Sequence, residues 1–228
     1  MKRALLEELQ CARVKKIPVA LVTELDVGAQ ALVYTDHQTA SELTFDLSRL
    51  AEIRALLRTA RSGLLDDSSL FVRSYVPAYR LLIVGAVHIA QALATLAREC
   101  GYQVTVIDPR RAFATEQRFH NTELCPEWPD EAMARLAPDA QTAVVTLAHD
   151  PKIDDPALIA ALGSQAFYIG ALGSRRTHEK RCERLAQQGM GEFLRRINAP
   201  IGLNLGGRSH AEIAVAILAQ IIQARYNE

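Results

Sequence analysis

The sequence has no excess of either charge and no long hydrophobic run. Lysine and arginine together number 26 among the 228 residues, and aspartate and glutamate also number 26. The chain therefore has no basic field that would attract nucleic acid or an anionic membrane. No apolar run reaches the roughly 18 residues of a membrane-spanning helix, and the opening MKRALLEELQCARVKK lacks the apolar centre of a secretory signal. We therefore expect a cytoplasmic protein that binds neither nucleic acid nor membranes.

The motifs of several enzyme classes are also missing. None of the four cysteines stands in a C-x-x-C pair, which disfavours zinc binding and dithiol redox chemistry. There is no nucleophile elbow, no Ser-His-Asp spacing and no Tyr-x-x-x-Lys couple. In HDPKIDDP, His149, Asp150 and Asp154 could bind a metal ion, but hydrogen bonding to a polar ligand is favoured because one loop supplies all three. We name no catalytic and no metal-binding residue, and we interpret three further histidines as ordinary surface or loop residues: His37, His120 and His210.

The residues that are present divide near residue 78 into two parts, because Pro77 separates two patterns of elements. We expect a small N-terminal α/β module over residues 1–78 and a larger domain over residues 79–228. The first part is expected to contain a helix over 1–16, a hairpin formed by VALVTEL and ALVYTD, a helix over 49–61 capped by Ser48, and a strand SLFVRSYV.

In the second part, buried strands alternate with helices. The expected strands are LLIVG, VTVID, TAVVTLAHD and AFYIGALGS, and the expected helices are AQALATLAREC, PDEAMARL, PALIAALG beginning at Pro156, RRTHEKRCERLAQQG, and AEIAVAILAQIIQAR with a Ser209–Glu212 capping box. This alternation predicts an α/β fold, namely a Rossmann-like, doubly wound and mostly parallel sheet.

The first strand–turn–helix of this domain resembles a dinucleotide-binding fingerprint. Gly85 and Ala90 match the first and last positions of G-x-G-x-x-G/A, whereas Val87 replaces the glycine that lets the backbone approach a pyrophosphate. Asp108 follows Gly85 at a distance that suits a ribose-binding acid. The turn either binds a phosphorylated ligand or is a purely structural βαβ turn.

The polar residues of this domain gather after the strands, where open α/β sheets bind ligands. We expect them to converge in one ligand pocket. The candidate cofactor-binding residues are Gly85, Ala86, Val87, His88, Asp108, Arg110, Arg111, Thr146, His149, Asp150, Lys152, Gly170, Gly173, Ser174, Arg175, Arg176 and His178.

Within this set, GALGSRR is the second anion-binding candidate. Gly170 and Gly173 permit close backbone approach, Ser174 can cap the following helix, and Arg175 or Arg176 can add charge-assisted contacts to an anion at the helix start. The alternative is a glycine-rich turn followed by a solvated basic face.

Taken together, these motifs resemble the XdhC/CoxI family of accessory proteins for xanthine dehydrogenase and related molybdenum hydroxylases. The matching segments are GAVHIAQAL, VIDPRRAFATEQRF, VVTLAHDPKIDDPAL, FYIGALGSRRTHEKRCERL and INAPIGLNLGGRSHAEIAVAILAQI. The resemblance implies a Rossmann-like C-terminal domain, a homodimer, and a chaperone that holds the molybdenum cofactor, as molybdopterin or its cytidine dinucleotide form. It implies an apo molybdenum hydroxylase as partner and a sulfurtransferase as a further one. The GSSPR-like motif and cysteine-containing segment of many members' N-terminal domains are missing.

Three functions therefore remain to be compared. The first is a non-catalytic carrier of the molybdenum cofactor, because a pterin phosphate or a pyrophosphate suits a helix N-terminus. The second is an NAD(P)-dependent oxidoreductase, which Gly85, Ala90 and Asp108 favour. The third is a nucleotide-sensing regulatory module without chemistry of its own. We favour the carrier.

Overall fold

The computed structural model describes residues 2–39, 43–66 and 68–226. The chain forms two compact units, Met1–Pro77 and Ala78–Glu228. Among the described residues, no helix combines the length and the apolar character needed to cross a membrane.

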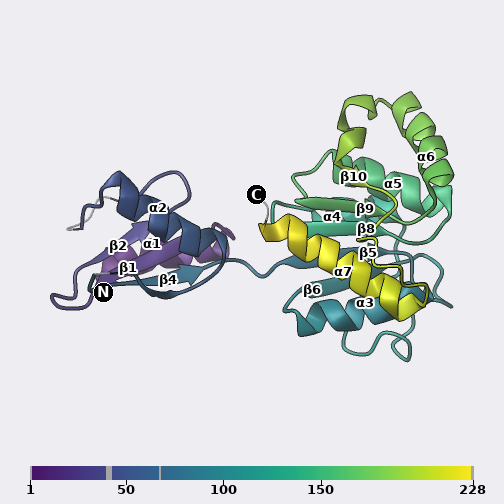
Figure 1. Ribbon diagram of the computed structural model, residues 1–228. Helices are drawn as coiled ribbons and strands as arrows, with labels where there is room; N and C mark the ends of the chain where they lie inside the picture. The colour runs from purple at the N-terminus through teal and green to yellow at the C-terminus, as the bar shows by residue number, and fades with distance from the viewer. Residues whose placement is uncertain (1, 40–42, 67, 227–228) are drawn as a thin grey trace. The chain divides into compact units, whose positions relative to one another are not determined.

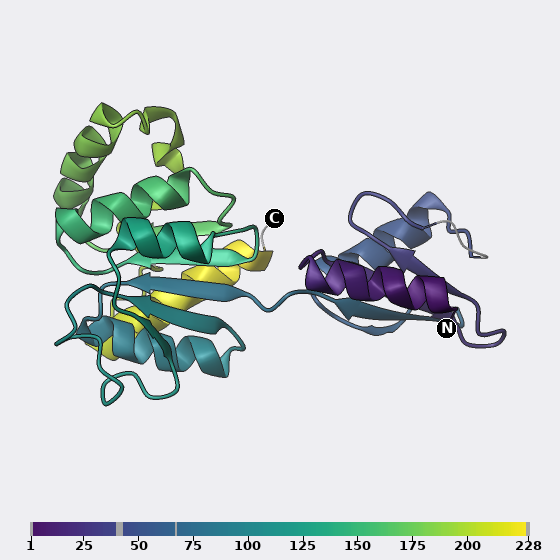
Figure 2. The same cartoon turned by 180° about the vertical axis from the view of Figure 1, so that it is seen from behind.

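The first unit is a four-stranded antiparallel sheet with one helix on each face (Figures 1 and 2). Its elements are α1 (Arg3–Val14), β1 (Val19–Glu24), β2 (Gln30–Val33), α2 (Leu47–Arg58), β3 (Gly63–Leu64) and β4 (Leu70–Tyr75), and the strand order is β2-β1-β4-β3. Alternation along β1 separates the two cores: Ala20 and Val22 pack with α2, whereas Val19 and Leu21 pack on the side of α1.

The expected hairpin is present as the antiparallel pair β1–β2. The expected cap of the second helix is wrong, because Asp46 rather than Ser48 accepts the hydrogen bond from the Arg49 backbone N–H, at 2.8 Å. Both residue types are good N-caps, and the helix begins two residues earlier than the sequence pattern indicated.

The second unit is a six-stranded sheet in which every neighbouring pair is parallel. Its elements are β5 (Arg80–Val84), α3 (His88–Glu99), β6 (Gln103–Ile107), β7 (Glu123–Cys125), α4 (Pro129–Leu136), β8 (Thr142–Thr146), α5 (Pro151–Leu162), β9 (Tyr168–Ala171), α6 (Arg175–Gln187), the 3-10 helix η1 (Gly191–Arg196), β10 (Ile197–Asn198) and α7 (His210–Tyr226). The order β10-β9-β8-β5-β6-β7 confirms the Rossmann-like doubly wound fold.

Two apolar layers cover this sheet. Leu81 and Ile83 of β5 pack with α3 and α7 on one face, and Leu82 and Val84 pack with α4 and α5 on the other. Figure 1 shows α7 in yellow in front of the strands, and Figure 2 shows it behind them. Because both faces are covered, the strands are nearly continuous apolar runs, as the sequence indicated.

Two helix starts in this unit test the sequence predictions. The capping box of α7 is confirmed, because the Glu212 N–H donates to Ser209 Oγ at 3.2 Å and the Ser209 N–H donates to Glu212 Oε2 at 2.9 Å. The expected start of α5 at Pro156 is wrong. Asp150 caps this helix and Pro151 is its first residue, which places Pro156 inside it.

Candidate functional site

The carboxyl ends of the central strands lie in register. Val84 of β5 pairs with both Ile107 of β6 and Thr146 of β8, and Thr146 pairs with Ala171 of β9. The loops that follow these strands therefore leave the sheet along one edge, which we call the carboxyl edge. The chain reverses its direction of winding between β5 and β8, which is the topological switch point where such sheets bind ligands.

The turn between β5 and α3 needs a glycine at its first position. Gly85 has a φ of +105°, and a Cβ there would lie 2.6 Å from the backbone nitrogen of Ala148 in the loop after β8. Val87 has a φ of −87° in the extended region, so its branched side chain is not strained. It is the N-cap of α3, and its apolar side chain makes no capping hydrogen bond to the first N–H groups of this helix.

Asp108 at the end of β6 stabilises that turn. Its carboxylate is fully buried and accepts hydrogen bonds from the Ala86 N–H at 2.8 Å and from the Arg110 backbone N–H, Nε and Nη2 at 2.8–2.9 Å. Burial raises the pKa of Asp108, but the donors on Arg110 and Ala86 outweigh it, so the pKa lies below its usual value. Both oxygens are occupied inside the protein, which leaves them no free position for a ribose hydroxyl.

Gly170 and Gly173 of GALGSRR are required by the local backbone and packing, whether or not a ligand binds there. A Cβ on Gly170 would collide with Cδ1 of Ile201, which packs over β9, so this position is closed by the protein itself. Gly173 has a φ of +141°, and Ser174 caps α6 by accepting from the Thr177 N–H at 3.2 Å. Farther along the helix, the His178 ring lies 3.4 Å from the Cys182 thiol sulfur.

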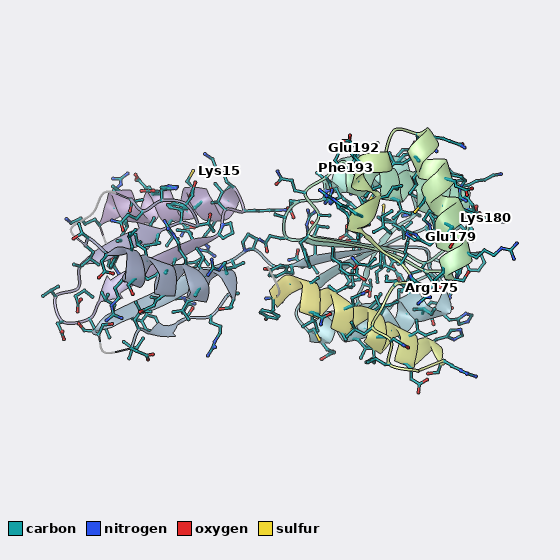
Figure 3. All side chains as sticks on the ribbon, turned by 45° about the horizontal axis from the view of Figure 1, so that its top comes forward. Lys15, Arg175, Glu179, Lys180, Glu192 and Phe193 are labelled. Carbon is teal, nitrogen blue, oxygen red and sulfur yellow. The ribbon has the colours of Figure 1, made fainter. Side chains whose placement is uncertain are left out.

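A pocket of about 310 Å³ opens between the β8–α5 loop and α6. We call it the α5–α6 pocket. It is lined by His149, Pro151, Asp154, Arg176, Thr177, Lys180, Arg181 and Arg184. Two of the expected site residues lie here, His149 and Arg176. Figure 3 shows Arg175 at the beginning of α6 and Lys180 farther along it.

The other arginines of this pocket are in contrasting environments. Arg184 donates to both oxygens of Asp155, at 2.6 and 3.0 Å, and this carboxylate raises the pKa of Arg184. Arg181 is 2 % exposed, and burial lowers its pKa. Its Nη2 donates to the Leu172 carbonyl at 2.8 Å, whereas its Nε and Nη1 have no acceptor among the described residues.

Asp154 is the buried acid of the pocket. It is 2 % exposed and accepts a hydrogen bond from the Ala148 N–H at 3.2 Å. Burial raises its pKa to about 6, and the Arg181 charge offsets only part of that effect.

The raised pKa predicts a pH-dependent effect of Asp154→Asn. Because the folded pKa exceeds the unfolded value of 3.8, the stability that protonated Asp154 contributes is complete below about pH 4 and lost as the pH rises through 6. Asparagine stays neutral and can still accept from Ala148. Asp154→Asn should therefore raise the free energy of unfolding relative to the unaltered protein, and this increase should be about 1 to 2 kcal/mol larger at pH 8 than at pH 5. Urea titrations followed by Trp128 fluorescence measure it; a pH-independent gain, or one matched by exposed Asp130→Asn, would contradict the prediction.

His210 has a closer link to the candidate site than its sequence indicated. Its ring stacks on that of His88, with centroids 5.3 Å apart and an angle of 15° between the planes. The first residues of α3 and α7 are thereby brought together at the carboxyl edge. The capping box around His210 accounts for the helix start and assigns no role to the histidine itself, so only the packing of α7 against α3 reveals this contact.

The expected residues do not all converge in one pocket. Thr146 is fully buried, and its Oγ1 has no partner among the described residues. Arg111, Lys152 and Arg175 are exposed and do not line the α5–α6 pocket. Arg110 is bound to Asp108 and covers the ring of Phe113. Among the residues that the structure describes, no group of three or more His, Cys, Asp and Glu side chains could hold a metal ion.

Comparisons with known proteins bear on the same domain. Residues 81–221 match the model of a family described as the XdhC Rossmann domain. The chain is 33% identical over 159 residues to the molybdenum cofactor insertion chaperone PaoD of Escherichia coli, covering 69% of this chain and 44% of that protein. It is 29% identical over 163 residues to a Bacillus subtilis protein described as a probable xanthine dehydrogenase subunit, covering 70% and 47%. The chain thus spans less than half the length of these two relatives.

A solved structure supports the fold. The crystal structure of a Bacillus halodurans protein described as a xanthine dehydrogenase superposes with a TM-score of 0.71 at 20% identity, covering 97% of this chain and 66% of that one.

Proposed function

The chain belongs to the XdhC family, and we propose that it is an accessory protein that binds the molybdenum cofactor and delivers it to an enzyme of the xanthine dehydrogenase type. The names of two relatives, a molybdenum cofactor insertion chaperone and a probable xanthine dehydrogenase subunit, support this role. The cofactor is the cargo of such a protein, in its molybdopterin or cytidine dinucleotide form.

The start of α3 is the structural feature that most directly supports the proposal. At the switch point, the N-cap residue of α3 makes no side-chain capping hydrogen bond, whereas Asp150, Ser174 and Ser209 supply acceptors at the starts of α5, α6 and α7. The start of α4 also has no side-chain cap, but α4 follows the marginal strand β7 rather than the switch point. The free N–H groups and the helix dipole at α3 fit a phosphate or pyrophosphate group. The glycine turn at Gly85 and the stacked rings of His88 and His210 border this helix start.

A role in nicotinamide binding receives less support. The spacing of Gly85 and Asp108 favoured it, but the Asp108 carboxylate is fully buried and saturated by Ala86 and Arg110. A ribose could bind it only if the Arg110 contacts were broken. Titration with NADH and NADPH, followed by nicotinamide fluorescence, should show no submicromolar binding.

A proline at the first residue of α3 tests the cargo site. His88→Pro removes one N–H donor at a helical position where proline is tolerated, and the extended Val87 before it is compatible with proline. The matched variant His88→Ala removes the imidazole but keeps the N–H. Loss of a charge-assisted hydrogen bond predicts cofactor binding about 10- to 100-fold weaker in His88→Pro than in His88→Ala.

Binding is measured by mixing each protein with cofactor released from a molybdenum hydroxylase, passing it through gel filtration and quantifying the retained pterin by fluorescence. The unaltered chain should retain cofactor and activate an apo molybdenum hydroxylase. Absence of retention by the unaltered chain would overturn the proposed function, and equal retention by the two variants would place the cargo elsewhere.

A further inference from the structure

The α5–α6 pocket has more positive charge than its carboxylates balance. Arg184 is paired with Asp155, but Arg176, Lys180 and Arg181 have no ion-pair partner among the described residues. Asp154 is the one carboxylate in the pocket wall, so two positive charges remain uncompensated when it is ionised. A dianion would balance them.

Arg181 shows that this surplus is not confined to the solvated rim. It is almost completely buried, and two of its donor atoms lack an acceptor among the described residues. An unpaired buried guanidinium is costly, because its N–H groups have lost water without gaining a partner. An anion in the pocket, whose wall includes Arg181, would add negative charge next to this guanidinium beyond that of Asp154 and Asp155.

The surrounding side chains fit a tetrahedral oxyanion. The guanidinium of Arg181 is a planar fork suited to phosphate oxygens, and Lys180 supplies a point charge. Thr177, between Arg176 and Lys180 on the same helix, adds a hydroxyl to the wall. The volume of about 310 Å³ leaves room for an organic group esterified to the phosphate.

We propose that the α5–α6 pocket is a binding site for a phosphoryl dianion, either inorganic phosphate or the terminal phosphate of a monoester. Its lining residues include none from α3, and the proposal does not depend on the proposed cargo function. None of the residues Thr177, Lys180, Arg181 and Arg184 was among those expected from the sequence.

Calorimetry with three small probes tests the ligand class. Inorganic phosphate and methyl phosphate carry two charges near pH 8, whereas dimethyl phosphate carries one. Methyl phosphate should bind with a Kd at or below about 1 mM and more tightly than dimethyl phosphate. Phosphate binding without methyl phosphate binding would identify the free ion as the ligand. Equal binding of the monoester and the diester, or no binding of any probe, would overturn the proposal.

Substitutions locate the site. Arg176→Gln and Lys180→Gln should each weaken methyl phosphate binding about three- to tenfold, and Arg181→Met should weaken it more than about tenfold. Arg175→Gln is the matched control, because this exposed neighbour does not line the pocket, and its effect should be less than about twofold. The two glutamine variants at exposed positions keep the test valid if Arg181→Met does not fold.

His88→Pro separates this site from the cargo site. It should leave methyl phosphate binding unchanged while it weakens cofactor retention. Loss of methyl phosphate binding in His88→Pro with full binding in Lys180→Gln would move the anion to α3 and overturn the pocket assignment. Equal effects of Arg175→Gln and Arg176→Gln would indicate only general electrostatic attraction and would also overturn it.

Discussion

Gly85→Ala is expected to lower the free energy of unfolding of the Ala78–Glu228 unit by about 3 kcal/mol or more. Alanine at a φ of +105° is strained by about 1 to 2 kcal/mol, because its Cβ approaches the backbone in that conformation. In addition, the Cβ would lie 2.6 Å from the backbone nitrogen of Ala148, which cannot rotate away as a side chain would. Relieving this clash by shifting the loop after β8 adds a cost typical of overpacking, about 1 to 3 kcal/mol.

Gly101→Ala is the matched control for this prediction. Gly101 also has a positive φ, +83°, but a Cβ there would meet no atom within 4 Å. We expect it to cost only the conformational strain, about 1 kcal/mol. Because Trp128 is the one tryptophan of the chain and lies in this unit, urea unfolding followed by its fluorescence reports on the right domain. Equal losses in the two variants would show that contact with Ala148 is not what requires glycine at this turn.

Asp108→Ala is expected to destabilise the same unit by about 3 kcal/mol at neutral pH. The substitution removes an acceptor of four hydrogen bonds and leaves the buried N–H of Ala86 without a partner. Breaking a buried ion pair typically costs about 3 to 5 kcal/mol, and the low end applies because the Arg110 side chain is 35% exposed and can be rehydrated. Urea unfolding monitored by far-ultraviolet circular dichroism and by Trp128 fluorescence measures the loss.

The size of this effect should depend on pH. Since the folded pKa of Asp108 is depressed, its carboxylate contributes stability above the unfolded pKa, and that contribution is lost as the pH falls through the folded pKa. The control is Glu127→Ala, which removes a similar two-pronged contact with Arg135 at the surface and should cost less than about 1 kcal/mol. A comparable loss for the two variants would mean that burial of Asp108 adds nothing.

The fold was largely predictable because its strands are strongly patterned. The alternation of apolar runs with helices, ending in the Ser209–Glu212 capping box, predicted the doubly wound sheet correctly. The strands β7 and β10 were not predicted, because three and two residues are too few to show a period. Pro156 was misread as a helix start because proline favours the first turn, whereas Asp150 and Pro151 form a stronger start one turn earlier.

The candidate site was less predictable, because sequence spacing locates a residue but not the partner of its side chain. Asp108 was placed at the correct strand end, yet Arg110 and Ala86 occupy the oxygens assigned to a ribose. Arg181 was not among the candidate residues, and only its burial distinguishes it from the exposed Arg175. A weak signal existed, since Thr177, Arg181 and Arg184 recur at the spacing of one helix face.

The shortness of β7 and β10 limits how this protein can associate with others. These two strands form the outer margins of the six-stranded sheet, and they offer only three and two residues of backbone for pairing. Long unpaired margins invite strand addition and aggregation, whereas very short ones discourage both. Partners of the Ala78–Glu228 unit should therefore dock on helices and loops, and continuous sheets built across two molecules are not expected.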